Sequence, residues 1–291
     1  MDPIRLQPSY GAPRMADAGL FGPDSVTWRV NREGVLLLGG GAAIILQLAH
    51  PLVAAGVSQH SNYRDEPWAR LYRTLDMTTK IMFGPTSLAE DTARRLRHVH
   101  GLVRGVTTES AGRFPAGTPY DSRTPDLRMW VHATLVHVSL LVYTRYVAPL
   151  TIADQRRYYE EQMLLAEKFG VPREQQPPTF AEFNQYFNAM LTSDETAVTD
   201  ALLDVVDATL NPPLPRVARP LVEALNLATI GMLPPALRSE LGLPWGPGRQ
   251  RLLDASRVVL STALPVLPRL VREFPPARSA DRRVRAQRIA A

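Results

Sequence analysis

The sequence predicts a single all-α domain with an extended N-terminal arm and a basic C-terminal tail. Three observations support this class: apolar residues recur at helical spacing, Gly and Pro end these segments sharply, and no strand–helix alternation indicates a parallel sheet. The length of 291 residues and the hydrophobic fraction of 45% suit one domain with a sizeable core. We place the arm at 1–25, the helical domain at 26–265 and the tail at 266–291.

The first elements follow from prolines and from one long apolar stretch. Four prolines within the first 23 residues favour an extended arm, and helical signals begin at Val26. Residues 35–57 are long enough to cross a bilayer, but three glycines, Gln47, His50 and Pro51 interrupt them. We therefore expect a buried central helix here and no transmembrane span.

The remaining helices are bounded by recognisable caps and breakers. Gly84-Pro85 ends a helix at 68–83, Ser87 with Glu90 forms a capping box for a helix that runs to about 104, and a loop follows at 105–124. A long apolar helix spans 126–146, and Thr151 with Asp154 begins a helix that Gly170 ends. Further helices are expected at 179–192, 194–210, 217–231, 234–241 and 247–264.

Composition excludes several classes of chemistry. The chain has no cysteine, which rules out disulfides, thiolate-ligated haem, iron–sulfur clusters and a cysteine nucleophile, and favours a cytoplasmic location. The tail accounts for the net charge of +5, because it contains seven arginines and two acidic residues, Glu273 and Asp281. No aromatic residues alternate with these arginines, so we expect no nucleic-acid binding and at most weak membrane-surface contact through the tail. The N-terminus does not have the pattern of a signal peptide.

The six histidines do not form a multi-histidine metal motif. None of them stand three or four residues apart, and His132 and His137, five apart, point about 140° away from each other on a helix. A single axial histidine for haem needs no such partner, and His132 and His50 both lie in strongly apolar helices. The alternative for each is a core histidine bonded to a backbone carbonyl or a carboxylate.

A second group of polar residues occupies one helix face. Arg70, Arg73 and Thr74 stand at i, i+3 and i+4, so their side chains lie together. Two guanidinium groups and a hydroxyl could hold a carboxylate, such as a propionate, or polarise dioxygen. The alternative is a solvated face whose arginines pair with nearby acidic residues, namely Asp65, Glu66 and Asp76.

Taken in order, these segments resemble a known family. They are the run GGGAAIILQLAHPLVAAGVSQHS, the pattern Arg70-x-x-Arg73-Thr74, Phe83-Gly84, the run WVHAT at 130–134, PPLP at 212–215, GMLPPALR at 231–238 and LGLPW at 241–245. Together they are similar to the rubber oxygenase (latex-clearing protein) superfamily, which includes the MpaB-like membrane-bound oxygenase of mycophenolic acid biosynthesis. The resemblance covers roughly residues 30–265.

The resemblance implies a globin-like helical core that binds haem b and uses dioxygen to cleave alkene bonds. It implies His132 as the axial iron ligand, His50 as a pocket group, and Arg70, Arg73 and Thr74 on the distal side. Rubber oxygenases have the pattern R-x-x-K-T there, so Arg73 replaces a lysine. Because arginine stays protonated, it is a poor iron ligand, which leaves the sixth position to water, dioxygen or His60. The expected partners are a small hydrophobic, unsaturated substrate, an isoprenoid or lipid, with dioxygen and an electron donor.

Two alternatives belong to other functional classes. The run VLLLGGGAAI could begin a nucleotide-binding oxidoreductase, but Ile44 stands where the third glycine belongs and no acidic residue follows a second strand. A non-catalytic haem or lipid-binding helical protein would keep an apolar pocket without activating oxygen, and this alternative stays open. No G-x-S-x-G motif supports a serine hydrolase.

Overall fold

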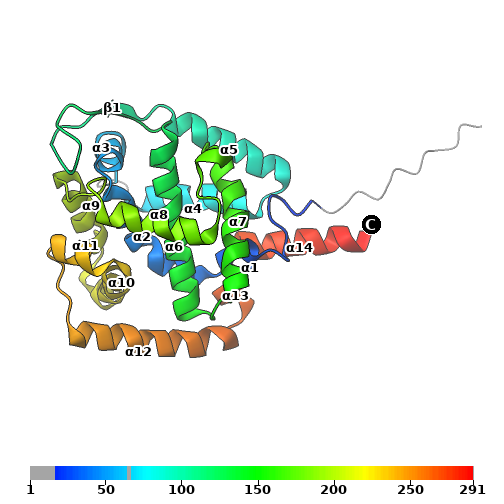
Figure 1. The fold of residues 1–291 in the computed structure, drawn as a ribbon. Coiled ribbons are helices and arrows are strands. Elements are labelled where there is room, and N and C mark those ends of the chain that lie inside the picture. The colour runs from blue at the N-terminus through cyan, green and yellow to red at the C-terminus, as the bar shows by residue number, and fades with distance from the viewer. Residues whose placement is uncertain (1–16, 64–66, 291) are drawn as a thin grey trace, which may run out of the picture.

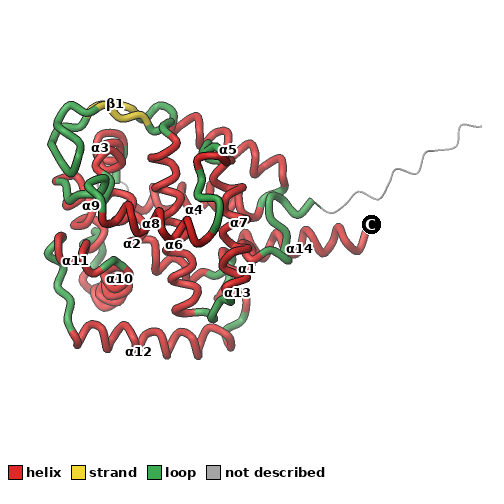
Figure 2. Tube along the Cα trace, in the orientation of Figure 1, coloured by secondary structure: helices red, strands yellow, loops and turns green. Residues whose placement is uncertain are grey.

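Helices make up most of the computed structural model, which describes residues 17–63 and 67–290 (Figures 1 and 2). The all-α prediction is confirmed. The first described helices are α1 (Val26–Asn31), α2 (Gly40–Leu48), α3 (Pro51–His60), α4 (Pro67–Phe83), α5 (Thr86–His100), α6 (Pro125–Tyr146) and α7 (Ile152–Lys168). They are followed by α8 (Phe180–Thr192), α9 (Asp200–Leu210), α10 (Arg219–Met232), α11 (Pro235–Glu240), α12 (Pro247–Ala263), α13 (Arg269–Arg272) and α14 (Pro275–Ala290). Short 3₁₀ helices are η1 (Gly34–Gly39), η2 (Arg173–Gln175), η3 (Arg216–Ala218) and η4 (Leu264–Val266).

The apolar stretch at 35–57 is buried, as expected, but it forms two helices with a sharp bend between them. Gly34–Leu48 and Pro51–His60 meet at 109°, because Pro51 lacks a backbone donor and His50 adopts an extended backbone. Close packing explains two of the glycines: a Cβ at Gly39 would overlap Val138, and one at Gly41 would overlap Thr229. No single helix among the described residues is long and apolar enough to cross a membrane, whereas this bent pair meets the length and composition criteria together.

Helix α6 runs through the middle of the molecule and positions the candidate site (Figure 1). Twelve of its residues are buried, and it packs against η1, α2, α7, α8 and α12. The indole of Trp130 donates a hydrogen bond to the carbonyl of Gln47 on α2, at 3.1 Å. This hydrogen bond joins the central helices α2 and α6, which also pack against each other.

The described core consists of two apolar clusters. The larger gathers side chains from α2, α6, α7, α8 and α9, including Met129, Trp130 and Ala133. The smaller joins α1, the end of α4, α5, α7 and α14 around Trp28 and Phe83, whose rings meet edge to face at 5.1 Å. Helix α6 therefore faces one cluster directly and approaches the other through α7.

The C-terminal end of the chain folds onto the domain more closely than the sequence indicated. Residues 275–290 form α14, which packs on α4 by burying Ala277, Ala280 and Val284, so most of the basic tail is a helix of the domain. The indole of Trp28 also donates to Asp281 at 3.1 Å. At the other end, residues 1–16 of the expected arm lie outside the described residues.

Two local predictions differ from the structure. Helix α5 begins at Thr86, and the expected capping box of Ser87 and Glu90 is not formed, because Asp17 accepts the Thr86 backbone N–H at 3.0 Å instead. The expected loop at 105–124 contains most of an antiparallel hairpin, β1 (Arg104–Val106) paired with β2 (Pro119–Asp121). Its strands are too short for a period-two pattern to show in the sequence.

Candidate functional site

His132 is a buried polar side chain near the middle of α6. Its side chain is 3% exposed, and neither ring nitrogen makes a hydrogen bond of normal geometry, although the backbone of Gln162 on α7 lies close enough to interact with the ring. Leaving a buried polar atom unpaired costs about 1–3 kcal/mol, so native proteins usually satisfy such atoms. The His132 ring is therefore a candidate ligand for a group that the chain itself does not supply.

The protonation state of His132 suits metal ligation. Burial lowers the pKa of His132 to about 4, and the nearby backbone of Gln162 on α7 offsets only part of this effect. At neutral pH the ring is thus an uncharged imidazole, which is the form that binds iron or zinc. No cluster of three or more His, Asp or Glu side chains near enough to hold a metal occurs among the described residues. A lone imidazole matches an axial haem ligand better than a multi-ligand metal site.

The end of α7 holds the surroundings of His132 in place. The ring of Phe169 lies edge-on to the His132 ring, with centroids 6.3 Å apart. Arg128, one turn before His132, donates to the Phe169 carbonyl at 3.1 Å, and Arg97 of α5 donates to the carbonyl of Lys168. Two guanidinium groups therefore bind the free carbonyls at this helix C-terminus, where positive charge is favoured.

His132 also lies where the two apolar clusters meet. Its neighbours Met129 and Ala133 belong to the larger cluster, while Phe169 packs against the smaller one. The ring therefore contacts the aromatic ring of Phe169 and lies on a helix whose neighbouring residues belong to the apolar core.

The structure places Arg70, Arg73 and Thr74 together on the first half of α4. Arg73 and Thr74 are exposed, Arg70 is half-buried, and the Thr74 hydroxyl donates to the Arg70 carbonyl at 3.0 Å. Burial lowers the pKa of Arg70, with a further contribution from the adjacent charge of Arg73. None of the three makes a hydrogen bond of normal geometry to the ring of His132.

Helix α4 is anchored at only one end. Its last residues, Ile81 to Phe83, are buried in the smaller cluster, whereas Leu71 and Tyr72 in the first half are exposed. Of the acidic residues that the solvated-face alternative invoked, Asp76 pairs with Lys80 at 2.6 Å. Asp65 and Glu66 lie outside the described residues. Leu71, Tyr72, Arg73 and Thr74 are therefore exposed on the first half of α4, in contrast to its buried end.

His50 and His60 are engaged elsewhere in the fold. His50 is the N-cap of α3, where its Nδ1 accepts the Leu52 backbone N–H at 3.3 Å. Its Nε2 lies 3.7 Å from Glu195, yet burial and the charge of Arg113 lower the pKa of His50 to about 4, so the pair is not an ion pair at neutral pH. His60 is exposed, and its Nε2 lies 3.2 Å from the carbonyl of Arg104 in the hairpin. The structure thus brings neither ring to His132.

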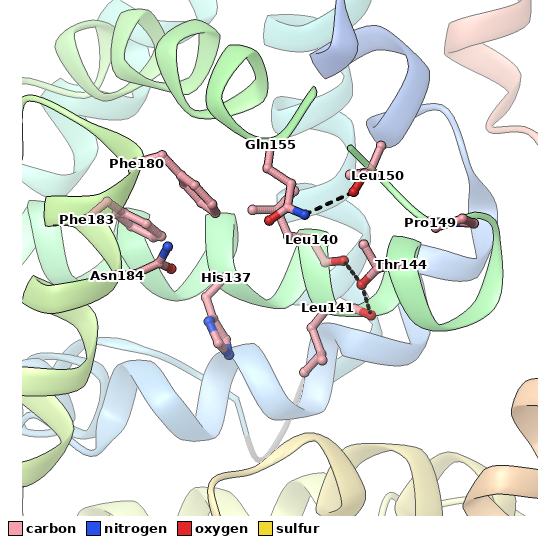
Figure 3. Close-up of a pocket in the computed structure, with 10 residues that line it drawn as sticks. All are labelled: His137, Leu140, Leu141, Thr144, Pro149, Leu150, Gln155, Phe180, Phe183 and Asn184. Atoms are coloured by element: carbon pink, nitrogen blue, oxygen red, sulfur yellow. Dashed lines mark hydrogen bonds between the residues drawn. The ribbon is translucent and has the colours of Figure 1, made fainter. Parts of the chain in front are cut away.

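A cavity on another side of α6 was not apparent from the sequence. It has a volume of about 430 Å³, and its lining includes His137, Gln155, Phe180 and Asn184 (Figure 3). Burial lowers the pKa of His137 to about 4, and its ring stacks on Phe187 with centroids 4.1 Å apart. The angular separation of His132 and His137 expected from their spacing means that this cavity is distinct from the surroundings of His132.

Sequence reasoning also missed the residues that frame His132. Phe169, Arg128 and Arg97 come from three different helices, and their roles depend on how those helices pack. The one local signal is Gly170, which ends α7 with a φ of +89° and leaves room for the Arg128 guanidinium.

Comparison with known proteins identifies the family of the chain. Residues 28–262 match the family model described as ER-bound oxygenase mpaB/B'/rubber oxygenase, catalytic domain. No curated protein and no solved structure matches the chain. Since the family model covers most of the helical domain, the chain belongs to the ER-bound oxygenase mpaB/rubber oxygenase catalytic-domain family.

Proposed function

We propose that the protein is a haem b-dependent oxygenase that acts, with dioxygen, on a small hydrophobic and unsaturated substrate of the isoprenoid or lipid kind. Membership of a family of oxygenases supports the reaction class. The observation that carries the proposal is the His132 ring, which is buried, uncharged at neutral pH and without a hydrogen bond of normal geometry.

The chemistry of His132 suits a haem ligand. A neutral imidazole among apolar groups is a common axial ligand, and neither nitrogen of His132 makes a hydrogen bond of normal geometry in the described structure. When bound, haem supplies a redox-active iron for dioxygen activation. The protein's part is to hold the imidazole neutral, to fix its orientation through the Arg128-braced end of α7, and to keep water away from it.

The first half of α4 would supply the polar partners. Arg70 and Arg73 offer planar, permanently charged donors suited to carboxylates, and haem carries two propionates. Thr74 adds a hydroxyl on the same face, next to the Arg70 carbonyl to which it donates. Because Arg73 cannot lose its proton at neutral pH, its role is to bind and orient an anion or a polar oxygen atom, and iron ligation is excluded for it.

The proposal is tested by haem binding to three matched proteins: the wild type, His132→Ala and His137→Ala. Both histidines lie on α6, and burial lowers the pKa of each to about 4, so His137→Ala controls for the loss of a neutral imidazole from the same helix. We expect near-stoichiometric haem and a Soret band in the wild type and in His137→Ala, and loss of both in His132→Ala. A wild type that cannot be loaded with haem would contradict the proposal.

Oxygen uptake separates an oxygenase from a carrier. We expect the reduced, haem-loaded wild type to consume dioxygen only when an unsaturated lipid is added. Haem binding without substrate-dependent uptake would instead favour the non-catalytic haem-binding alternative.

A further inference from the structure

Helix α12, the 3₁₀ turn η4 and helix α13 expose an unusual set of large aliphatic side chains. Six of them, between 61% and 81% exposed, fall within twenty residues: Leu252, Val258, Val259, Val266, Leu270 and Val271. Single exposed apolar residues are normal on protein surfaces, but a concentration of this kind marks an interaction surface. We refer to these six residues as the aliphatic surface.

The aliphatic surface faces away from the domain. Helix α12 packs on α6 and α10 through Leu253, which is buried, and Leu264 just beyond its end is buried on the same side. At 3.6 residues per turn, Val258 lies about 140° around the helix from Leu253, and Val259 lies about 120° from it in the opposite direction. Because Leu253 points into the domain, both valines point outward. In Figure 1, α12 lies along the lower edge of the molecule with no element beyond it.

The same part of the chain is strongly cationic. Residues 247–290 contain ten arginines and three acidic residues. Each acidic residue is already bonded to an arginine: Asp254 to Arg145 at 2.8 Å, Glu273 to Arg269 at 2.8 Å, and Asp281 also to Arg269. On α12 itself, Arg249, Arg251 and Arg257 are exposed, and Arg282 and Arg285 are exposed on α14. Residues 247–290 therefore carry a net positive charge, and all three acidic side chains there are paired with arginines.

We propose that the aliphatic surface and the flanking arginines dock the protein on an anionic lipid bilayer. Aliphatic side chains enter the boundary between headgroups and acyl chains, while guanidinium groups bind lipid phosphates from beside them. The six apolar residues are all aliphatic, which is unlike a surface that stacks nucleic-acid bases or the aromatic-rich centre of a protein interface. The proposal thereby extends the weak membrane contact expected of the C-terminal tail, which includes α13, to helix α12.

Vesicle flotation with the full chain tests the proposal. The variant Val258→Ser/Val266→Ser/Leu270→Ser removes three aliphatic groups of the surface. The matched control Val99→Ser/Leu102→Ser/Val106→Ser removes three others that are 51% to 65% exposed near the hairpin. The hairpin lies at the opposite end of α6 from α12, since Arg128 bonds to Ser122 and Arg145 to Asp254, about 26 Å apart along the helix.

We expect the wild type to bind vesicles of equimolar phosphatidylcholine and phosphatidylserine. The α12–α13 variant should weaken this binding about tenfold or more, and so should added salt or the omission of phosphatidylserine. The control variant binds like the wild type. The proposal is overturned if the wild type does not bind these vesicles, or if both variants bind equally well. It is also overturned if light scattering shows a wild-type dimer that the α12–α13 variant dissociates, because the surface then serves a second copy.

A site-specific probe adds a readout that does not depend on affinity. Because the chain has no cysteine, Val266→Cys and Leu102→Cys each accept a single environment-sensitive fluorophore. We expect a blue shift on adding the anionic vesicles for the label at 266 and none for the label at 102. Equal shifts at both positions would contradict docking through α12 and α13.

Discussion

Three histidines of this protein, two buried and one half-buried, differ in what their rings contact. His50 caps a helix, His137 borders a cavity, and His132 makes no hydrogen bond of normal geometry. Burial lowers the pKa of each to about 4, so all three are neutral at pH 7. Charge state alone therefore does not single out a ligand, whereas the lack of a normal hydrogen bond at His132 does.

The histidine pKa values predict an acid-sensitive fold. Each lies below the unfolded value of 6.5, so protons bind the unfolded chain preferentially and stability is lost as the pH falls from about 6.5 towards 4. His50→Asn removes one such group while an asparagine can still cap α3. Between pH 7 and pH 5 we expect the free energy of unfolding to fall about 1–2 kcal/mol less in the variant than in the wild type, measured with urea. Parallel pH profiles would contradict this assignment.

Gly170 links a backbone conformation to the bracing of His132. Its φ is +89°, and an added Cβ would overlap the Arg128 guanidinium that donates to Phe169. Gly117 has a φ of +87° but open space around it. We expect Gly170→Ala to lower the free energy of unfolding by about 2–4 kcal/mol and Gly117→Ala by about 1 kcal/mol, in urea titrations. Equal effects would show that the contact with Arg128 contributes nothing.

At the scale of single elements, helix boundaries depend on whether the cap is local. Helix α7 was predicted correctly because Thr151 accepts the Asp154 backbone N–H at 3.0 Å, three residues on. Helix α5 was also predicted, but its cap was not, because the Thr86 backbone N–H is bonded by Asp17, 69 residues earlier in the chain. A pattern search along the sequence finds the first kind of cap and misses the second.

The distant cap of α5 is testable. Burial acts to raise the pKa of Asp17, but hydrogen bonds from Thr86 and Gly19 outweigh it and the pKa is lowered. We expect Asp17→Ala to cost about 1 kcal/mol of stability at pH 7, an effect that shrinks as the pH falls below about 4, because the carboxylate is then protonated. Ser87→Ala, which would break the predicted capping box, should change thermal stability little. If Ser87→Ala lowered stability more than Asp17→Ala did, the capping box of Ser87 and Glu90 would be the correct assignment.

At the scale of the whole molecule, the sequence predicted the class, the central helices and the apolar setting of His132, because these depend on periodicity within one segment. It did not predict that the arginine-rich end closes the domain. That contact joins residues more than two hundred positions apart, as in the bidentate pairing of Arg272 with Glu33, whose two bonds are both 2.7 Å long. Nor could it show which side of α6 faces α7.

Closure by α14 predicts the effect of deleting residues 275–291. The deletion exposes Trp28, which is 1% exposed and donates to Asp281. We expect a lower melting temperature and a red shift of tryptophan fluorescence, since indole emission moves to longer wavelengths in water. A truncated chain with unchanged melting and emission would show that the segment is a dispensable tail.

The haem content of His132→Gly, purified with and without imidazole in the medium, tests the central claim most directly. Free imidazole can occupy the space that the ring leaves and replace its nitrogen, whereas it cannot repair a fold that has collapsed. The proposed ligation predicts that the variant loses nearly all of its haem and recovers it, with the Soret band, when imidazole is present. Full haem content in His132→Gly without imidazole would contradict the claim that His132 holds the iron.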